Sequence, residues 1–321
     1  TAGGRFHFTR TTPVTIEARA SVAEYDKGAR TLTLHCTTQI PGIVRDKLSE
    51  IFDLPGPRIR VIAPDVGGGF GGKTSLYSEE IVACAIARDL GKPVKWVSDR
   101  MEDLMTTGNA FDEIVDAEIA VDAEGKILAV KADVIGDVGA YSIYPWTATI
   151  EPVQVVSFLP GPYRIDNYAA RVRAVATNKT LTGAYRGVGR PISVFVMDRL
   201  LDMAARKIGM DPTEIRRRNL VNDDEFPYKA ASGLVWDKSA FQACLRRAAD
   251  GIGYDDLRRE QETARAEGRW VGIGIACYAE LTGVGSRIAV APGMPINTGT
   301  ETCSVAIDST GAVTASFGLA S

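Results

Sequence analysis

Five of the six residues at positions 67–72 are glycine, and only Phe70 interrupts them before Lys73. Glycine reaches backbone conformations that other residues avoid, and it allows a ligand to lie directly against the main chain. An apolar run precedes this segment, and the helix-compatible run SLYSEEIVACAIARDLG follows it. The chain must therefore fold so that a bare glycine loop joins extended to helical structure, which marks the loop as a place where a ligand can bind.

The same loop also satisfies the phosphate-binding pattern G-x-x-x-x-G-K-[ST], between Gly67 and Thr74. An ATPase of this type needs in addition a buried strand that ends in an aspartate for Mg²⁺. The candidate is SVFVMD, which ends at Asp198, but its apolar residues continue at helical spacing through the aspartate. Asp198 is thus expected inside a helix, and Phe70 suits a large organic cofactor better than a triphosphate. A P-loop ATPase is therefore the less favoured alternative.

The rest of the chain mixes strand-like and helix-like patterns without a regular alternation of the two. We expect strands at residues 14–23, 31–38, 93–100 and 168–177, a hairpin of residues 111–122 and 126–137, and further strands at 270–280 and 302–317. Helices are expected at 41–54, 75–91 and 191–209, after the N-cap residue Asp211, and at 238–249. This mixture predicts an α+β fold in which mixed sheets pack against helices.

A change in composition predicts how the chain divides. Residues 251–269, GIGYDDLRREQETARAEGR, are polar and read as a linker. We therefore expect a first domain at residues 1–250 and the truncated start of a second domain at 270–321. The arginine run at 216–218 is interpreted as a solvated face.

Composition excludes several classes of function. With only His7 and His35, a histidine-based metal site or a Ser-His-Asp triad is excluded, so a cofactor is expected to supply any chemistry. The cysteines stand singly, which predicts small buried side chains in a reducing, cytoplasmic compartment; they are Cys36, Cys84, Cys244, Cys277 and Cys303. A net charge of -3 argues against nucleic acid, and no apolar run is long enough to predict a membrane span.

A second glycine-rich segment, TNKTLTGAYRGVGRP, occupies residues 177–191 and precedes a predicted helix. Two such loops can converge on one anionic cofactor through backbone N–H groups and helix N-termini. Together with TTQ at 37–39, GGGFGGK at 67–73 and DPTEIRRRNL at 211–220, this segment resembles the molybdenum-binding large subunit of the xanthine oxidase family, closest to its carbon monoxide dehydrogenase-like and aldehyde oxidase-type members. The resemblance covers residues 14–220, and residues 272–285 and 301–313 resemble the opening of that family's second molybdenum domain.

The resemblance implies a site built mainly from main chain. Molybdenum would be held by a pterin dithiolene, as molybdopterin cytosine dinucleotide, and by no protein ligand. Gln39 and Arg186 would be catalytic, with Gln39 hydrogen-bonded to an oxygen on the metal and Arg186 beside it. Phe70 and Val188 would line the substrate pocket. The cofactor-binding residues would be Gly68, Gly69, Phe70, Gly71, Gly72, Ala184, Tyr185, Arg186 and Gly187.

The implied reaction inserts oxygen from water into a C–H bond next to a carbonyl or a ring nitrogen. Electrons would leave through 2Fe-2S and FAD partners, in a homo-oligomer of the heteromer. Gly187 stands where carbon monoxide dehydrogenases have a copper-binding cysteine. Val188 stands where purine oxidases have a phenylalanine, and Gln154 lies near the place of their arginine. An aldehyde or N-heterocycle hydroxylase is therefore expected, with carbon monoxide dehydrogenase as the alternative.

The family's subunit is longer than this chain, and its catalytic glutamate lies in a C-terminal region that the chain does not contain. We therefore expect the chain by itself to be an inactive fragment without molybdenum, completed by the remainder of the subunit. A non-catalytic interaction module remains a second alternative.

Overall fold

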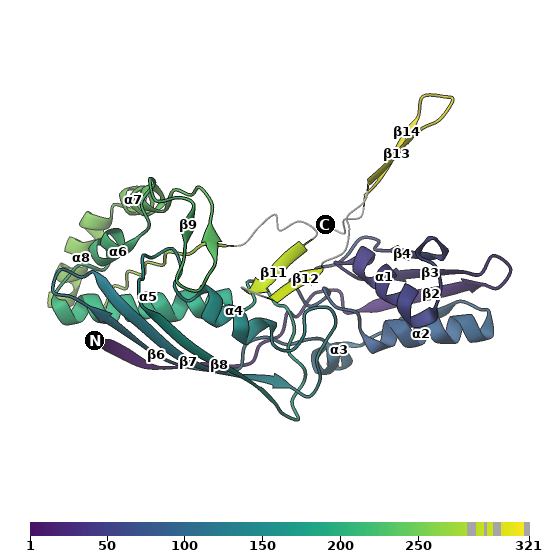
Figure 1. Cartoon of the computed structure of the whole chain (residues 1–321), viewed down its shortest axis with the longest axis horizontal. Helices are drawn as coiled ribbons and strands as arrows, with labels where there is room; N and C mark the ends of the chain where they lie inside the picture. The colour runs from purple at the N-terminus through teal and green to yellow at the C-terminus, as the bar shows by residue number, and fades with distance from the viewer. Residues whose placement is uncertain (281–286, 292–293, 298–302, 318–321) are drawn as a thin grey trace.

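Two mixed four-stranded sheets organise the part of the chain that the computed structural model describes, which is residues 1–280, 287–291, 294–297 and 303–317. Each sheet carries its own helices and its own hydrophobic core, and the two lie at opposite ends of the long axis in Figure 1. The combination of mixed sheets and packed helices confirms the α+β prediction.

The first sheet has the strand order β1-β6-β7-β8. Strands β6 and β7 form the predicted antiparallel hairpin, β1 pairs antiparallel with β6, and β8 runs parallel to β7. Helix α5 lies over β1 and β6, and helix α4 lies over β7 and β8 (Figure 1). The bounds are β1 Ala2–Phe8, β6 Glu113–Val121, β7 Ile127–Gly139, β8 Tyr168–Ala176, α4 Ile150–Phe158 and α5 Arg190–Ile208.

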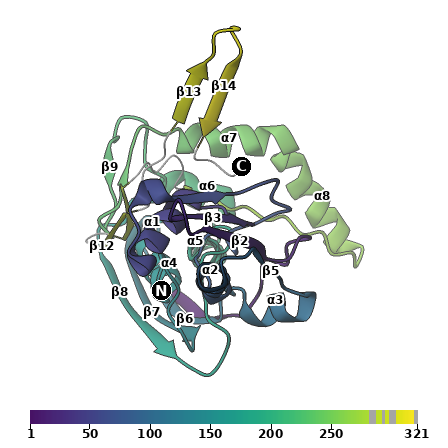
Figure 2. The same cartoon turned by 90° about the vertical axis from the view of Figure 1, so that its right-hand side faces the viewer.

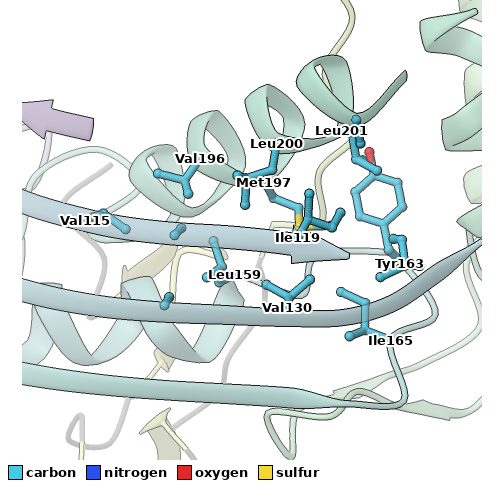
Figure 3. Packing of buried hydrophobic residues seen from close by; sticks show 14 of the residues in the cluster. Val115, Ile119, Val130, Leu159, Tyr163, Ile165, Val196, Met197, Leu200 and Leu201 are labelled. Carbon is cyan, nitrogen blue, oxygen red and sulfur yellow. The ribbon is translucent and has the colours of Figure 1, made fainter. Parts of the chain in front are cut away.

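The core between this sheet and its helices follows from two periodicities. Every second residue of β6 points to the helices, and α5 presents one apolar face at three-to-four spacing. Figure 3 shows these side chains in contact, with Val196 and Leu200 of α5 packed against the strands. The same helical spacing runs through Asp198, which lies inside α5 as expected.

The second sheet has the order β4-β3-β2-β5, and helices α1 and α2 supply the buried residues that pack on it. Helix α2 ends at a left-handed Gly91, the predicted stop signal. The strand expected at 14–23 was placed too early, because the chain pairs only from Ala20 onward. The bounds are β2 Ala20–Asp26, β3 Thr31–Cys36, β4 Ile59–Ile62, β5 Val94–Val97, α1 Pro41–Phe52 and α2 Ser78–Leu90.

The remaining elements lie outside the two four-stranded sheets. They are the helices η1 Gly56–Arg58, α3 Arg100–Thr106, α6 Pro212–Asn219, α7 Phe241–Ile252 and α8 Tyr254–Ala266, and the paired strands β9 Tyr228–Lys229 with β10 Val235–Trp236, β11 Arg287–Ala291 with β12 Met294–Asn297, and β13 Cys303–Ile307 with β14 Val313–Phe317. Figure 2 shows α6, α7 and α8 grouped on one side of the molecule.

Two expectations were wrong in this region, and the linker expected at 251–269 is largely helical. This stretch is mostly helix α8, with acidic residues in its first turn and Gly253 between it and α7, and the division into domains stays a prediction. Residues 270–280 form neither helix nor strand, so the strand expected there is absent from the described residues. The arginine run is only partly solvated, because Arg216 is fully buried while its two neighbours are exposed.

The cysteine prediction holds for two positions. Cys36 and Cys84 are buried in the second core, where burial raises the pKa of both thiols, that of Cys84 to about 12. Cys244 and Cys303 are exposed, against expectation. Of the helices in the described ranges, none has the length and apolar character that crossing a membrane requires.

Candidate functional site

The two glycine loops, residues 67–73 and 183–190, lie against each other. The backbone N–H of Arg186 donates to the carbonyl oxygen of Phe70 across 2.9 Å. Gly71 has a φ of +99°, and a Cβ there would lie 2.6 Å from the carbonyl oxygen of Ala184. Only glycine permits this approach, so the sequence of the first loop allows the second loop to dock onto it.

Gln39 joins the same cluster from the segment between β3 and α1. Its Oε1 accepts a hydrogen bond from the Gly71 N–H at 3.1 Å, and its backbone N–H donates to Lys73 O at 2.9 Å. A side chain at Gly69 would overlap the Gln39 amide. Because Oε1 is occupied, the Nε2 group is the part of the amide that remains to donate to a ligand.

The other residues of the two loops surround this contact. Gly68 (φ +94°) lies beside the Phe70 ring, and the Gly72 N–H closes a turn onto Gly69 O at 2.8 Å. Tyr185 follows Ala184 and packs its ring against that of Phe111 at 5.9 Å. Both non-glycine residues predicted to line a pocket are in the left-handed region, Phe70 and Val188 each at a φ of +52°.

Arg186 supplies the charge at this junction. Its side chain is exposed, and within the described residues its guanidinium makes no hydrogen bond or ion pair. An exposed arginine on a loop whose backbone is already anchored is free to bind an anion. Phe70, 48% exposed, provides an apolar surface next to it.

Lys73 excludes the phosphate-loop interpretation. It is 2% exposed, and its Nζ donates to both the carbonyl oxygen and the carboxylate Oε2 of Glu17, each at 2.9 Å. Burial opposes ionisation of Glu17, but hydrogen bonds from Lys73 and the Gly67 N–H outweigh it and lower the pKa of Glu17. Helix α2 begins at Ser78, several residues later, so Lys73 is a tether for the loop and not a phosphate ligand.

The second loop is seated on helix α4. A Cβ at Gly189 would overlap the carbonyl of Glu151, and one at Gly187 (φ +89°) would lie 2.6 Å from Pro191 Cγ. Gln154 is buried and accepts a hydrogen bond from Arg190 Nη1 at 2.9 Å. The sequence reading missed Arg190 and Glu17 because nothing in the pattern relates them to their distant partners.

The donor set fits an anionic cofactor that carries its own metal. Within the described chain, no acceptor is in place for the backbone N–H groups of Gly69, Phe70 and Gly187. No cluster of three or more metal-binding side chains occurs among the described residues. Main-chain amides, one amide side chain and one guanidinium can hold a charged organic group but not a bare metal ion.

Comparison with known proteins decides the family. Residues 2–220 match the family described as "Molybdopterin cofactor-binding domain". This chain belongs to that molybdopterin cofactor-binding family. Its relatives include the carbon monoxide dehydrogenase large chain of Hydrogenophaga pseudoflava, 32% identical over 99% of this chain and 40% of that protein. The nicotine 6-hydroxylase large subunit of Paenarthrobacter nicotinovorans is 34% identical over 98% of this chain and 38% of that protein.

A solved structure shares the fold of the whole chain. Quinoline 2-oxidoreductase from Pseudomonas putida 86 superposes with a TM-score of 0.92 at 35% identity, covering 100% of this chain and 41% of that one. The chain thus spans about 40% of the length of these relatives. The resemblance to the molybdenum-binding large subunits is confirmed.

Proposed function

We propose that this chain forms one side of the cofactor site in the large subunit of a molybdenum hydroxylase. The observation that carries the proposal is the junction of the two glycine loops, where the Gln39 amide and the Arg186 guanidinium are both left available. When bound, molybdopterin cytosine dinucleotide would supply the two-electron oxidation of the substrate. The residues of this chain would bind and orient that group.

Each residue type suits its proposed role. Gln39 would donate its Nε2 hydrogens to an oxygen of the bound group, since Oε1 is held by Gly71. Arg186 would stabilise negative charge, because a guanidinium stays protonated at any physiological pH. The free amides of Gly69, Phe70 and Gly187 would bind anionic atoms of the cofactor. Phe70 and Val188 would form an apolar wall of the substrate pocket.

For substrate, we propose an N-heterocycle or an aldehyde, with water as the oxygen source. The names of the nicotine and quinoline enzymes support a nitrogen heterocycle. Gln154 is already bound to Arg190, which argues against a purine clamp at that position. We further propose that electrons pass to iron-sulfur and flavin partners in the cytoplasm, consistent with relatives named as large chains and subunits.

Carbon monoxide dehydrogenase is the second candidate, because two relatives carry that name. Gly187 argues against it, since the position has no thiol and a side chain there would press on Pro191. We expect no carbon monoxide-dependent dye reduction and no copper in the complete enzyme. Copper equimolar with molybdenum would establish this second candidate, whereas reduction of dye by quinoline-type or aldehyde substrates would establish the first.

The site residues are tested by two substitutions in the complete enzyme. Gln39→Glu keeps an acceptor for the Gly71 N–H but removes the donor, and Arg186→Ala removes the charge. Each is expected to lower kcat roughly 100-fold or more, as loss of one preorganised donor does in comparable sites. Arg246→Ala, on an exposed face of α7, is the matched control and should keep full turnover. Wild-type turnover in both site variants would refute the assignment.

A further inference from the structure

Two glutamates are buried side by side beneath the second glycine loop. Glu113 begins β6 and Glu151 lies in the first turn of α4, and each is 1% exposed. Neither carboxyl oxygen of Glu113, nor Oε2 of Glu151, has a hydrogen-bond partner in the described part of the chain. Glu113 pairs with Gly136 of β7, where a Cβ would lie 2.9 Å from Pro152 Cβ and 3.6 Å from Glu113 Cδ. The pair therefore lies in a tightly packed, largely apolar site.

Two carboxylates cannot both ionise in such a place, because each charge lacks solvation and repels the other. Burial raises the pKa of Glu113 well above its usual value, and the charge of Glu151 raises it further. Burial also raises the pKa of Glu151 to about 8. The Phe111 N–H and Arg10 oppose this rise, and the charge of Asp112 adds to it. At neutral pH the pair therefore retains at least one proton.

Glu151 contacts the second loop through two routes. Its backbone carbonyl packs directly against Gly189, where there is no room for a side chain. Its carboxyl group accepts a hydrogen bond from the Phe111 N–H, and the Phe111 ring packs against Tyr185, the neighbour of Arg186. Movement of Glu151 would therefore reach both ends of the loop segment 185–189.

The segment that joins Glu151 to Tyr185 also needs support. Phe111 and Asp112 have φ values of 67° and 73°, a region that non-glycine residues occupy only when their surroundings hold them. Asp112 is held by Arg10 Nε at 3.0 Å and Lys179 Nζ at 2.8 Å. The backbone N–H of Phe111 has the Glu151 carboxyl group as its hydrogen-bond acceptor.

We propose that burial keeps the Glu113–Glu151 pair protonated at neutral pH and that this protonated pair positions the second glycine loop. The inference rests on the proposed function only for its effect on turnover, since the loop and the pair can be observed without the cofactor. Glu113 and Glu151 are thus positioning residues that act through Phe111 and Gly189.

The proposal has a definite pH dependence. The pKa of each glutamate is raised in the folded protein. Opening the loop exposes the pair to water, so the pair then releases protons at any pH above the ordinary pKa of glutamate. The protection of the loop should then be greatest at low pH and should decline as pH rises toward about 8, the pKa of Glu151, and further for as long as Glu113 stays protonated. One released proton makes the opening equilibrium about tenfold larger for each pH unit.

Hydrogen exchange of the peptide containing residues 183–190 tests this directly. After correction for intrinsic exchange, opening in the complete protein should increase at least about tenfold between pH 6 and pH 7. The double variant E113Q/E151Q removes both carboxyl groups of the pair and should lose this dependence. Glu80→Gln, a buried glutamate of α2 in the other core, should keep it. An unchanged pH slope in the double variant would overturn the proposal.

Two further measurements separate positioning from simple stability. Glu151→Ala should expose the loop to exchange at every pH, and Glu151→Gln, which still accepts from the Phe111 N–H, should restore protection. Infrared spectra of ¹³C-glutamate protein, recorded in the Glu80→Gln background at pH 7, should contain a protonated carboxyl band that E113Q/E151Q lacks. Absence of that band in the Glu80→Gln protein would contradict the protonated pair, whatever the molybdenum content or turnover.

Discussion

At the scale of single residues, the site depends on how closely main chains approach one another. Gly71 combines a positive φ with a neighbouring carbonyl, that of Ala184, which a Cβ would meet at 2.6 Å. At Gly69, a Cβ would instead overlap the Gln39 side chain. Both glycines therefore serve the docking of the loops.

Gly71→Ala should lower the free energy of unfolding by about 1–3 kcal/mol, because strain at a positive φ adds to a backbone clash. The measurement is urea unfolding of the variant beside the wild type. Gly251→Ala is the matched control, since it lies in helix α7 with open space around it and should raise stability by about 0.5–1 kcal/mol. Equal stabilities of the two variants would show that the loops are not packed as described.

At the scale of elements, helix α6 carries a charge into the interior. Asp211 caps this helix as predicted, with its Oδ1 accepting from Thr213 N–H at 2.7 Å. Arg216 Nε then pairs with Asp198 of α5 at 2.7 Å, and Nη2 donates to Ile275 O at 2.9 Å. Burial raises the pKa of Asp198 to about 6, although Arg216 opposes this. The arginine thus joins α5, α6 and residues 270–280.

Arg216→Ala should cost roughly 3–5 kcal/mol of stability, because it leaves Asp198 buried without its partner. Arg217→Ala, one residue further on the same helix, should cost less than about 1 kcal/mol, since its pair with Glu214 is 61% exposed on the arginine side. Thermal and urea unfolding of both variants provide the comparison. A small loss for Arg216→Ala would mean that water reaches Asp198.

At the scale of the whole molecule, two separate cores hold the loops between them. The first loop leaves the second sheet after β4, and the second loop leaves the first sheet after β8. Leu48 of α1 and Leu200 of α5 are each 0% exposed, one in each core. The relative position of Gln39 and Arg186 therefore depends on both cores.

Leu48→Ala and Leu200→Ala should each destabilise the protein by roughly 2–5 kcal/mol through the cavity left behind. In the double variant the two losses should add to within about 0.5 kcal/mol, because the side chains share no partner. A double-mutant cycle from urea unfolding measures this. A coupling energy above about 1 kcal/mol would show that the two cores behave as one.

The sequence by itself determined the fold class, most helices, the central hairpin and the glycine loops, because these follow from local spacing and backbone chemistry. It also placed Asp198 in a helix, which argued against a P-loop before any contact was known. The division at 251–269 into two domains stays a prediction, although α8 occupies the expected linker.

Only the tertiary structure decided which side chains are neutralised and which remain available. Lys73 looks like a phosphate ligand until Glu17, 56 residues away, is seen to bind it. The sequence predicts a solvated Arg216, whereas the structure buries it against Asp198. No local sequence pattern predicts the buried Glu113–Glu151 pair. These outcomes depend on contacts between residues distant in the chain, whose desolvation and pairing energies no periodicity or motif encodes.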